Sequence, residues 1–196
     1  MRTHWRRAYR MGMPDVAKVW TREEVLALPD DGKRYELVDG ELLVSPSPRP
    51  LHQYAQQQFN LILAAYVNRH RLGGLLCSPA DLDLRSEQLV QPDLFVLRQP
   101  DGRPVRAWAD AGIPLLVVEI LSPTTARFDR TIKRPALQQA GVSEVWLVDL
   151  DARLVERWRP DDTRPEVLIE RLDWRPVGVQ ASLGIDLGAY FAAVLD

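Results

Sequence analysis

Three helices are predicted from the sequence, and in one of them apolar side chains recur at a helical spacing. Between Leu51 and His70 they fall on one side of a predicted long helix, which should end before the glycine pair at residues 73 and 74. A short helix is predicted after Thr21-Arg-Glu-Glu24, which has the form of a capping box, and should end at Pro29. A third helix is predicted from about residue 128 to about residue 141.

Other apolar runs have the length and composition of strands. Two of them form Tyr35–Val44 and are joined at Asp39-Gly40, a dipeptide typical of a tight hairpin turn. The remaining predicted strands are Leu75–Leu84, Asp93–Leu97, Pro114–Leu121, Glu144–Asp149, Leu154–Trp158 and Glu166–Leu172. Strands interleaved with helices predict an α/β domain, and hairpins require antiparallel pairs, so its sheet should be mixed.

Composition fits one ordinary globular domain. The chain has 196 residues, of which 46% are hydrophobic, and we expect one domain over residues 14–196. Residues 1–13 carry four arginines and are expected to be a flexible basic arm, which could contact DNA, or an upstream start-site extension. No run approaches the about 18 apolar residues of a membrane span, and no signal peptide is recognisable, so a cytoplasmic protein is expected. The lone Cys77 is expected to be core filler.

The net charge of −2 limits the kind of nucleic-acid binding that this chain can show. A strong nonspecific binder is usually basic, so affinity for phosphate would have to come from a local patch or from a metal ion. Zinc-ligand spacing, a phosphate-binding glycine loop and a serine elbow are absent from the sequence.

Two acids stand at apolar strands. Glu119 interrupts Pro114-Leu-Leu-Val-Val-Glu-Ile-Leu121, where an ionised carboxylate costs several kcal/mol unless something binds it. Asp93 opens another apolar run after Pro92. Two such carboxylates, with water, suffice to hold Mg²⁺, for which Mn²⁺ should substitute. Alternatively, Asp93 caps a turn and Glu119 pairs with an arginine.

Hydrolysis would also need a basic residue near these acids. Leu121, two residues after Glu119 on the same face of the strand, cannot serve. The nearest alternative is Lys133, in the predicted third helix, where Asp129 and Lys133 form an i, i+4 pair. The alternative interpretation of Lys133 is an exposed surface lysine.

These residues resemble the PD-(D/E)xK nuclease signature, in the form whose lysine has moved to the following helix. More narrowly, the sequence is similar to the bacterial family of putative restriction endonucleases from about Thr21 to Phe191. The similar segments are Arg34-Tyr-Glu-Leu-Val-Asp-Gly-Glu41, His52, Gln91-Pro-Asp93, Leu116–Pro123, Lys133 and Ala140–Asp149. Two departures are Leu137, where the family has tyrosine, and Pro135, inside the helix that carries Lys133.

The resemblance implies a restriction-endonuclease-like core and a Mg²⁺-dependent endonuclease that hydrolyses DNA. Asp93 and Glu119 would hold the metal and Lys133 would act on the water or the phosphate. Of the two acids that flank the hairpin turn, Glu36 rather than Glu41 would be an additional acid that reaches toward the metal or the attacking water. The alternative interpretation of Glu36 is a solvated acid on a strand. His52 would contact phosphate or line the site, or would be a surface histidine.

Two further interpretations remain open: an inactive domain of this fold that works as a binding or scaffold module, and a metal-dependent enzyme on a nucleotide or other phosphoester. A homodimer is also expected, because a duplex has two strands to cut. An interface could be formed by the apolar residues of 154–172, by Trp174 and by the C-terminal Leu183–Leu195.

Overall fold

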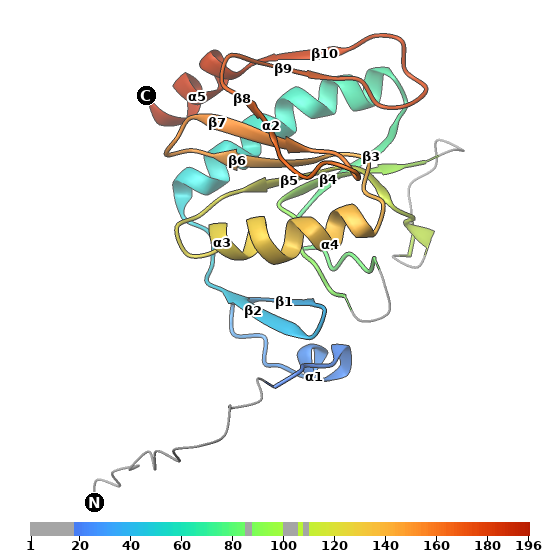
Figure 1. The fold of residues 1–196 in the computed structure, drawn as a ribbon, viewed down its shortest axis with the longest axis vertical. Coiled ribbons are helices and arrows are strands. Elements are labelled where there is room, and N and C mark those ends of the chain that lie inside the picture. Colours follow the sequence, from blue (N-terminus) through green and yellow to red (C-terminus); the bar gives the residue numbers. More distant parts are fainter. Residues whose placement is uncertain (1–17, 85–87, 100–105, 108–109) are drawn as a thin grey trace, which may run out of the picture.

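The computed structural model describes residues 18–84, 88–99, 106–107 and 110–196, and its centre is a six-stranded mixed sheet (Figure 1). Residues 1–13, predicted to be an arm, lie outside the described residues. The spatial order of the strands is β3-β4-β5-β6-β7-β8. Their bounds are β3 Gly73–Cys77, β4 Leu94–Arg98, β5 Pro114–Ile120, β6 Val145–Asp149, β7 Leu154–Trp158 and β8 Glu166–Leu168. Strands β5 and β6 are parallel and the other neighbours are antiparallel, as predicted for a mixed sheet.

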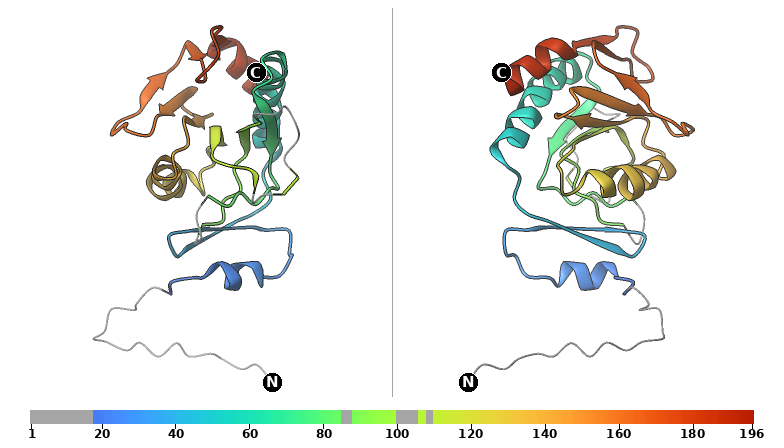
Figure 2. Two further views of the ribbon diagram at one scale, coloured as in Figure 1. Left: turned by 90° about the vertical axis from the view of Figure 1, so that its right-hand side faces the viewer. Right: turned by 60° about the vertical axis from the view of Figure 1, so that its left-hand side comes forward.

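Helices cover both faces of this sheet (Figure 2). One face packs against α2, Pro50–Arg69, and α5, Leu187–Leu195. The other face packs against a helical rod that comprises α3 Ala126–Phe128, the π-helical turn Asp129–Lys133 and α4 Arg134–Gln139. Successive residues of a strand point to opposite faces, so β4 and β5 supply apolar side chains to both cores. The predicted α/β fold is therefore confirmed.

A separate two-stranded hairpin precedes α2. Its strands are β1 Arg34–Val38 and β2 Glu41–Ser45, and the turn at Asp39 and Gly40 has φ angles of 48° and 83°. Glycine tolerates this left-handed region and Asp adopts it more readily than most residues, which explains why the dipeptide predicted the turn. The short helix α1, Arg22–Leu26, starts with the predicted capping box at Thr21.

The C-terminal part differs from its prediction. The single strand predicted over Glu166–Leu172 is wrong, because the chain bends at residues 169 and 170 and ends its pairing with β7 there. It then forms β9, Arg171–Trp174, which pairs with β10, Leu183–Asp186, in a second two-stranded sheet. These residues and α5 bury their apolar side chains in the chain's own core, where the Tyr190 hydroxyl donates to the Ala55 carbonyl at 3.1 Å.

Two other predictions near β3 are wrong. The strand predicted to run to Leu84 ends at Cys77, because Pro79 has no N–H to donate to a strand ladder. Cys77 is exposed rather than core filler, since β3 has a strand neighbour on only one side in the described sheet. None of the described helices has the length and apolar character needed to cross a membrane.

Candidate functional site

Asp93 and Glu119 lie side by side at one end of the sheet. Strand β4 is antiparallel to β5, and the register pairs Leu94 with Val118, so the preceding Asp93 comes opposite Glu119. The backbone N–H of Ile120 donates to Asp93 Oδ2 at 2.8 Å, and both acidic side chains are only 2% exposed. The two acids singled out from the sequence thus meet in space.

Asp93 is held by a dense set of donors. Its Oδ2 atom also lies 3.0 Å from His52 Nε2, and its Oδ1 atom accepts from Arg34 Nη1 at 3.0 Å. The Gln56 side-chain amide donates to the Asp93 carbonyl oxygen at 2.7 Å. Burial alone would raise the pKa of Asp93, but the hydrogen bond from His52 and the charge of Arg34 outweigh it and lower the pKa to about 2.

Lys133 is fully buried between two carboxylates. Its ammonium lies 2.6 Å from Glu36 Oε1 and 2.8 Å from Glu119 Oε1. Burial opposes the charged ammonium, yet Glu119 and Glu36 raise the pKa of Lys133 above its ordinary value. Burial raises the pKa of Glu119 well above its ordinary value, and the negative charges of the neighbouring acids raise it further. The positive charge of Lys133 lowers this pKa but does not offset the two effects. The interpretation of Lys133 as an exposed surface residue is wrong.

Glu36 and Glu41 have different environments. Glu36 is completely buried, and its Oε1 atom accepts from the Gln91 backbone N–H at 2.8 Å as well as contacting Lys133. Its Oε2 atom makes no hydrogen bond and lies 3.4 Å from Arg34 Nε. Glu41 is exposed at the start of β2. Of the two hairpin acids, only Glu36 therefore faces the acidic cluster.

The π-helical turn explains how a helix containing Pro135 can present Lys133. The Arg134 N–H donates five residues back, to the Asp129 carbonyl, and leaves the Arg130 carbonyl without its usual backbone donor. Pro135 cannot supply one, and the Arg134 side chain donates to the Arg130 carbonyl at 3.0 Å instead. Leu137, the other departure from the family pattern, is fully buried among apolar side chains of the sheet.

Three residues of the cluster were not predicted as site residues. Arg34 precedes Glu36 by two positions on β1, and hence shares its face of the strand. Gln56 follows His52 by one helical turn on α2. Asp129 is buried, and burial raises its pKa to about 6 despite the nearby charge of Lys133. For Arg34 and Gln56, the available signal in the sequence was their spacing from Glu36 and His52, which places each pair on one face of its strand or helix.

Comparison with known protein families places the chain in one of them. Residues 22–187 match the Uma2 family, described as "Putative restriction endonuclease". The chain belongs to this family. The predicted family is thereby confirmed, and its match spans the hairpin, the acidic cluster and the rod.

A solved structure shows the same fold. It is described as a putative nuclease of the DUF820 family from Anabaena variabilis, and shares 22% sequence identity with this chain. The match covers 90% of this chain and 99% of that one, with a TM-score of 0.66. A search of curated proteins found no match.

The cluster of this Uma2 family member has the chemistry of a hard-cation site. Four buried carboxyl groups, those of Glu36, Asp93, Glu119 and Asp129, accompany two permanently charged cations, Arg34 and Lys133. Carboxyl oxygen donors suit a divalent ion such as Mg²⁺ that keeps several water ligands. Within the described ranges, no three His, Cys, Asp or Glu side chains converge to hold a metal, so the fit is to two carboxylates and water.

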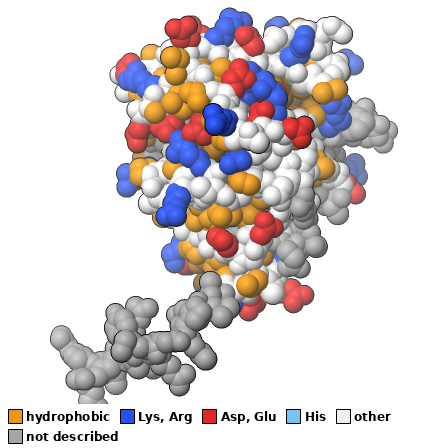
Figure 3. Space-filling model, in the orientation of Figure 1, with side chains coloured by type: hydrophobic (Ala, Val, Ile, Leu, Met, Phe, Trp, Pro, Cys, Tyr) orange, Lys and Arg blue, Asp and Glu red, His pale blue; other side chains and the backbone are white. Residues whose placement is uncertain are grey.

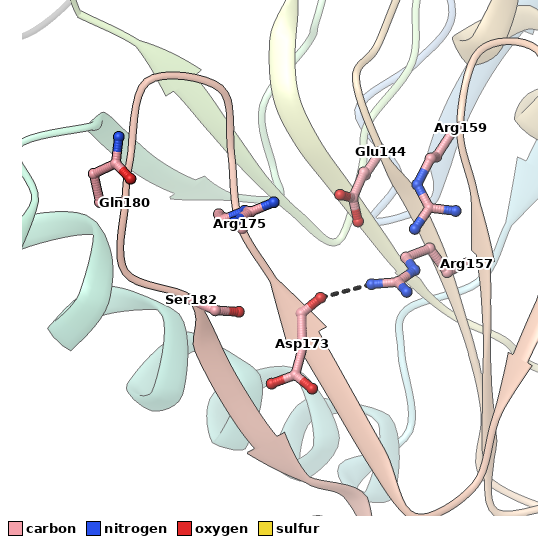
Figure 4. A pocket seen from close by; sticks show the side chains of 7 residues that line it. All are labelled: Glu144, Arg157, Arg159, Asp173, Arg175, Gln180 and Ser182. Carbon is pink, nitrogen blue, oxygen red and sulfur yellow. Dashed lines mark hydrogen bonds between the residues drawn. The ribbon is translucent and has the colours of Figure 1, made fainter.

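A hollow of about 440 Å³, separate from this cluster, lies between β7 and the β9-β10 hairpin (Figure 4). It is lined by Glu144, Arg157, Arg159, Asp173, Arg175, Gln180 and Ser182. Arg157 donates to the Asp173 carbonyl at 2.6 Å and pairs with Glu166 at 2.7 Å. The bond to Asp173 connects the β9-β10 hairpin to the main sheet, whereas Glu166 belongs to β8 of that sheet. The lining mixes both charge signs.

The visible surface has no extended basic region. In the orientation of Figure 1, basic and acidic side chains are interspersed over the face (Figure 3). This distribution agrees with the net charge of −2 and provides no broad electrostatic surface for a phosphate backbone on that face. Binding of a nucleic acid by that face would have to depend on local contacts.

Proposed function

We propose that this protein is a Mg²⁺-dependent endonuclease that hydrolyses phosphodiester bonds of DNA. The observation that carries the proposal is the pairing of Asp93 and Glu119 on neighbouring strands, with the Lys133 ammonium 2.8 Å from Glu119. Membership of a family described as putative restriction endonuclease supports DNA as the substrate.

In this proposal, Asp93 and Glu119 would hold the metal, with the Ile120 carbonyl as a further oxygen donor. When bound, a divalent ion would lower the pKa of a water ligand and polarise the phosphate. Lys133 orients the attacking water or neutralises charge that develops on the phosphate, and Glu36 fixes the ammonium of Lys133 or supports a second ion. His52 orients Asp93 through its Nε2 atom, and its contact with a substrate phosphate stays a prediction.

The test combines metal binding with cleavage. Titration calorimetry with Mg²⁺ and Mn²⁺ should show binding by the wild type and by Lys133→Met, since lysine is not a ligand for these ions. Glu119→Gln should lose that binding. A supercoiled plasmid should be nicked by the wild type in either ion, while both variants lose at least about 100-fold in rate, the usual contribution of such a group.

Glu41→Gln is the matched control, because it removes an exposed acid from the same part of the molecule. It should bind metal and cleave like the wild type. Equal metal binding by the wild type and Glu119→Gln would exclude Glu119 as a ligand, and undiminished cleavage by Lys133→Met would exclude the role of Lys133.

The alternative is an inactive binding or scaffold module. It is favoured by one observation, namely that Arg34 and Lys133 already pair with the acids that would hold the metal. Metal binding by the wild type without cleavage of plasmid, linear duplex or single-stranded DNA would support this alternative over the endonuclease.

We also propose that the protein acts as a homodimer, which would present two sites to the two strands of a duplex. Most of the apolar residues first assigned to the interface are buried in the chain's own core, among them Trp158, Leu172 and Trp174. Val167 and Ile169, which are 54% and 61% exposed, remain available at the β8 edge of the sheet.

A further inference from the structure

Arg34 occupies the space between two acids of the cluster. It is the first residue of β1, and its guanidinium lies 3.0 Å from Asp93 Oδ1 and 3.4 Å from Glu36 Oε2. It also donates to the Gln91 carbonyl at 3.1 Å. A single arginine thus bridges the hairpin, the segment before β4 and the candidate metal ligand.

Arg34 takes the oxygen of Asp93 that a metal ion would need. The Oδ2 atom of Asp93 is already in contact with the Ile120 N–H at 2.8 Å and His52 Nε2 at 3.0 Å. The Oδ1 atom accepts a hydrogen bond from Arg34 Nη1 at 3.0 Å. A carboxylate oxygen offers about two acceptor sites, so Oδ2 is filled, and a cation that binds Asp93 would have to use Oδ1, where it would meet the positive charge of Arg34.

The two cations of the cluster differ in their access to solvent. The Lys133 side chain is 0% exposed, whereas that of Arg34 is 22% exposed. Arg34 can therefore move outward without passing through the core. Its planar guanidinium presents a fork of donors that matches the oxygens of a phosphate, which the point charge of a lysine does not.

We propose that Arg34 occupies the cation position at Asp93 until a divalent metal ion enters, and then binds a backbone phosphate of the DNA substrate. This inference rests on the proposed endonuclease function. Metal entry and substrate binding would be coupled through one side chain, because each requires Arg34 to leave Asp93.

The first measurement is metal affinity in the absence of DNA. Arg34→Gln removes the competing charge, and we expect its Mn²⁺ affinity to rise about tenfold above that of the wild type, as expected when one nearby like charge is removed. Arg34→Lys keeps the charge and should bind Mn²⁺ like the wild type. Thermal unfolding with and without Mn²⁺ gives an independent readout and shows that each variant is folded.

The second measurement is binding of a short DNA duplex in Ca²⁺, a hard cation with looser geometry than Mg²⁺. Arg34→Gln should bind more weakly and show a salt dependence reduced by about one phosphate contact. Arg34→Lys should also bind more weakly, because it lacks the fork. The control is Arg153→Gln, which removes the same charge from an arginine paired with Asp196 outside the cluster and should not change Mn²⁺ affinity.

The outcomes separate this inference from the function on which it rests. If the wild type and Arg34→Gln bind Mn²⁺ equally, the metal site stands and the role of Arg34 is overturned. If Arg34→Gln gains Mn²⁺ affinity but keeps the wild-type salt dependence with DNA, the phosphate contact is overturned. If no form of the protein binds Mn²⁺, the proposed metal-dependent function fails, and the inference fails with it.

Discussion

At the scale of single residues, the charges around Lys133 depend on one another. A buried ammonium is tolerable only because Glu36 and Glu119 both lie within 2.8 Å of it. Loss of one partner from a buried ion pair typically costs about 3–5 kcal/mol, because the other charge stays buried without compensation. Substitutions in this cluster must therefore be checked for folding before any loss of activity is assigned to chemistry.

Asp129 gives the cluster a pH dependence of stability. Burial raises its pKa in the folded protein to about 6, from an ordinary value of 3.8, so folding is favoured when this carboxyl is protonated. Its contribution is complete below pH 3.8 and is lost as the pH rises through 6. Asp129→Asn should therefore raise the free energy of unfolding at pH 8 by about 1–3 kcal/mol.

Urea unfolding from pH 4 to pH 8 measures this effect. The advantage of Asp129→Asn over the wild type should shrink toward zero near pH 4, and the exposed Asp161→Asn should show no such trend. An advantage that is the same at every pH would mean that the substitution acts through packing or hydrogen bonding instead.

The sequence predicted part of this cluster for a clear physical reason. Glu119 was identifiable because a carboxylate among apolar strand residues needs a partner, and the antiparallel register then brings Asp93 opposite it. Arg34 and Gln56 could not be assigned in the same way. Their contacts with Asp93 depend on how the hairpin and α2 dock against β4, and strand or helix periodicity alone does not determine that docking.

At the scale of elements, the rod from Ala126 to Gln139 keeps Lys133 in place despite Pro135. The Arg130 carbonyl lacks its usual backbone donor in this rod and accepts from the Arg134 side chain at 3.0 Å instead. The same guanidinium donates to Gln138 Oε1 at 2.6 Å and lies over the Trp158 ring at 3.9 Å from its centre. One side chain therefore replaces the backbone hydrogen bond that the π-helical turn and Pro135 remove.

Arg134→Leu should destabilise the fold by about 1–2 kcal/mol, the cost of leaving a partly buried carbonyl without its hydrogen bond. Arg127→Leu, on the exposed side of the same rod, is the matched control and should change stability by less than about 0.5 kcal/mol. Urea denaturation of both variants measures the difference. Similar values for the two would contradict the proposed role of the Arg134 side chain in the turn.

The elements that the sequence predicted well have strong local signals. The capping box at Thr21 and the Asp39-Gly40 turn act within a few residues, so they were visible without knowledge of the fold. The break between β8 and β9 could not be predicted from the sequence. Residues 166–172 have strand character throughout, and the change of partner from β7 to β10 is decided by packing between segments distant in sequence.

At the scale of the whole molecule, the order of the strands leaves β8 as one edge of the main sheet. Within the described residues, β8 pairs with β7 alone, and Val167 and Ile169 at this edge are more than half exposed. Unpaired strand edges readily pair with another chain. For the proposed homodimer, the arrangement of the sheet therefore favours this edge over the C-terminal residues as the interface.

Light scattering at micromolar concentration should give the mass of a dimer for the wild type. Val167→Lys should shift it to the mass of a monomer, because a charge at the centre of an apolar interface must be desolvated without a partner. Val177→Lys is the control, since Val177 is 79% exposed outside β8 and its substitution should leave the dimer intact. A wild-type mass that stays monomeric as concentration rises would overturn the dimer, and a dimer that tolerates both lysines would place its interface elsewhere.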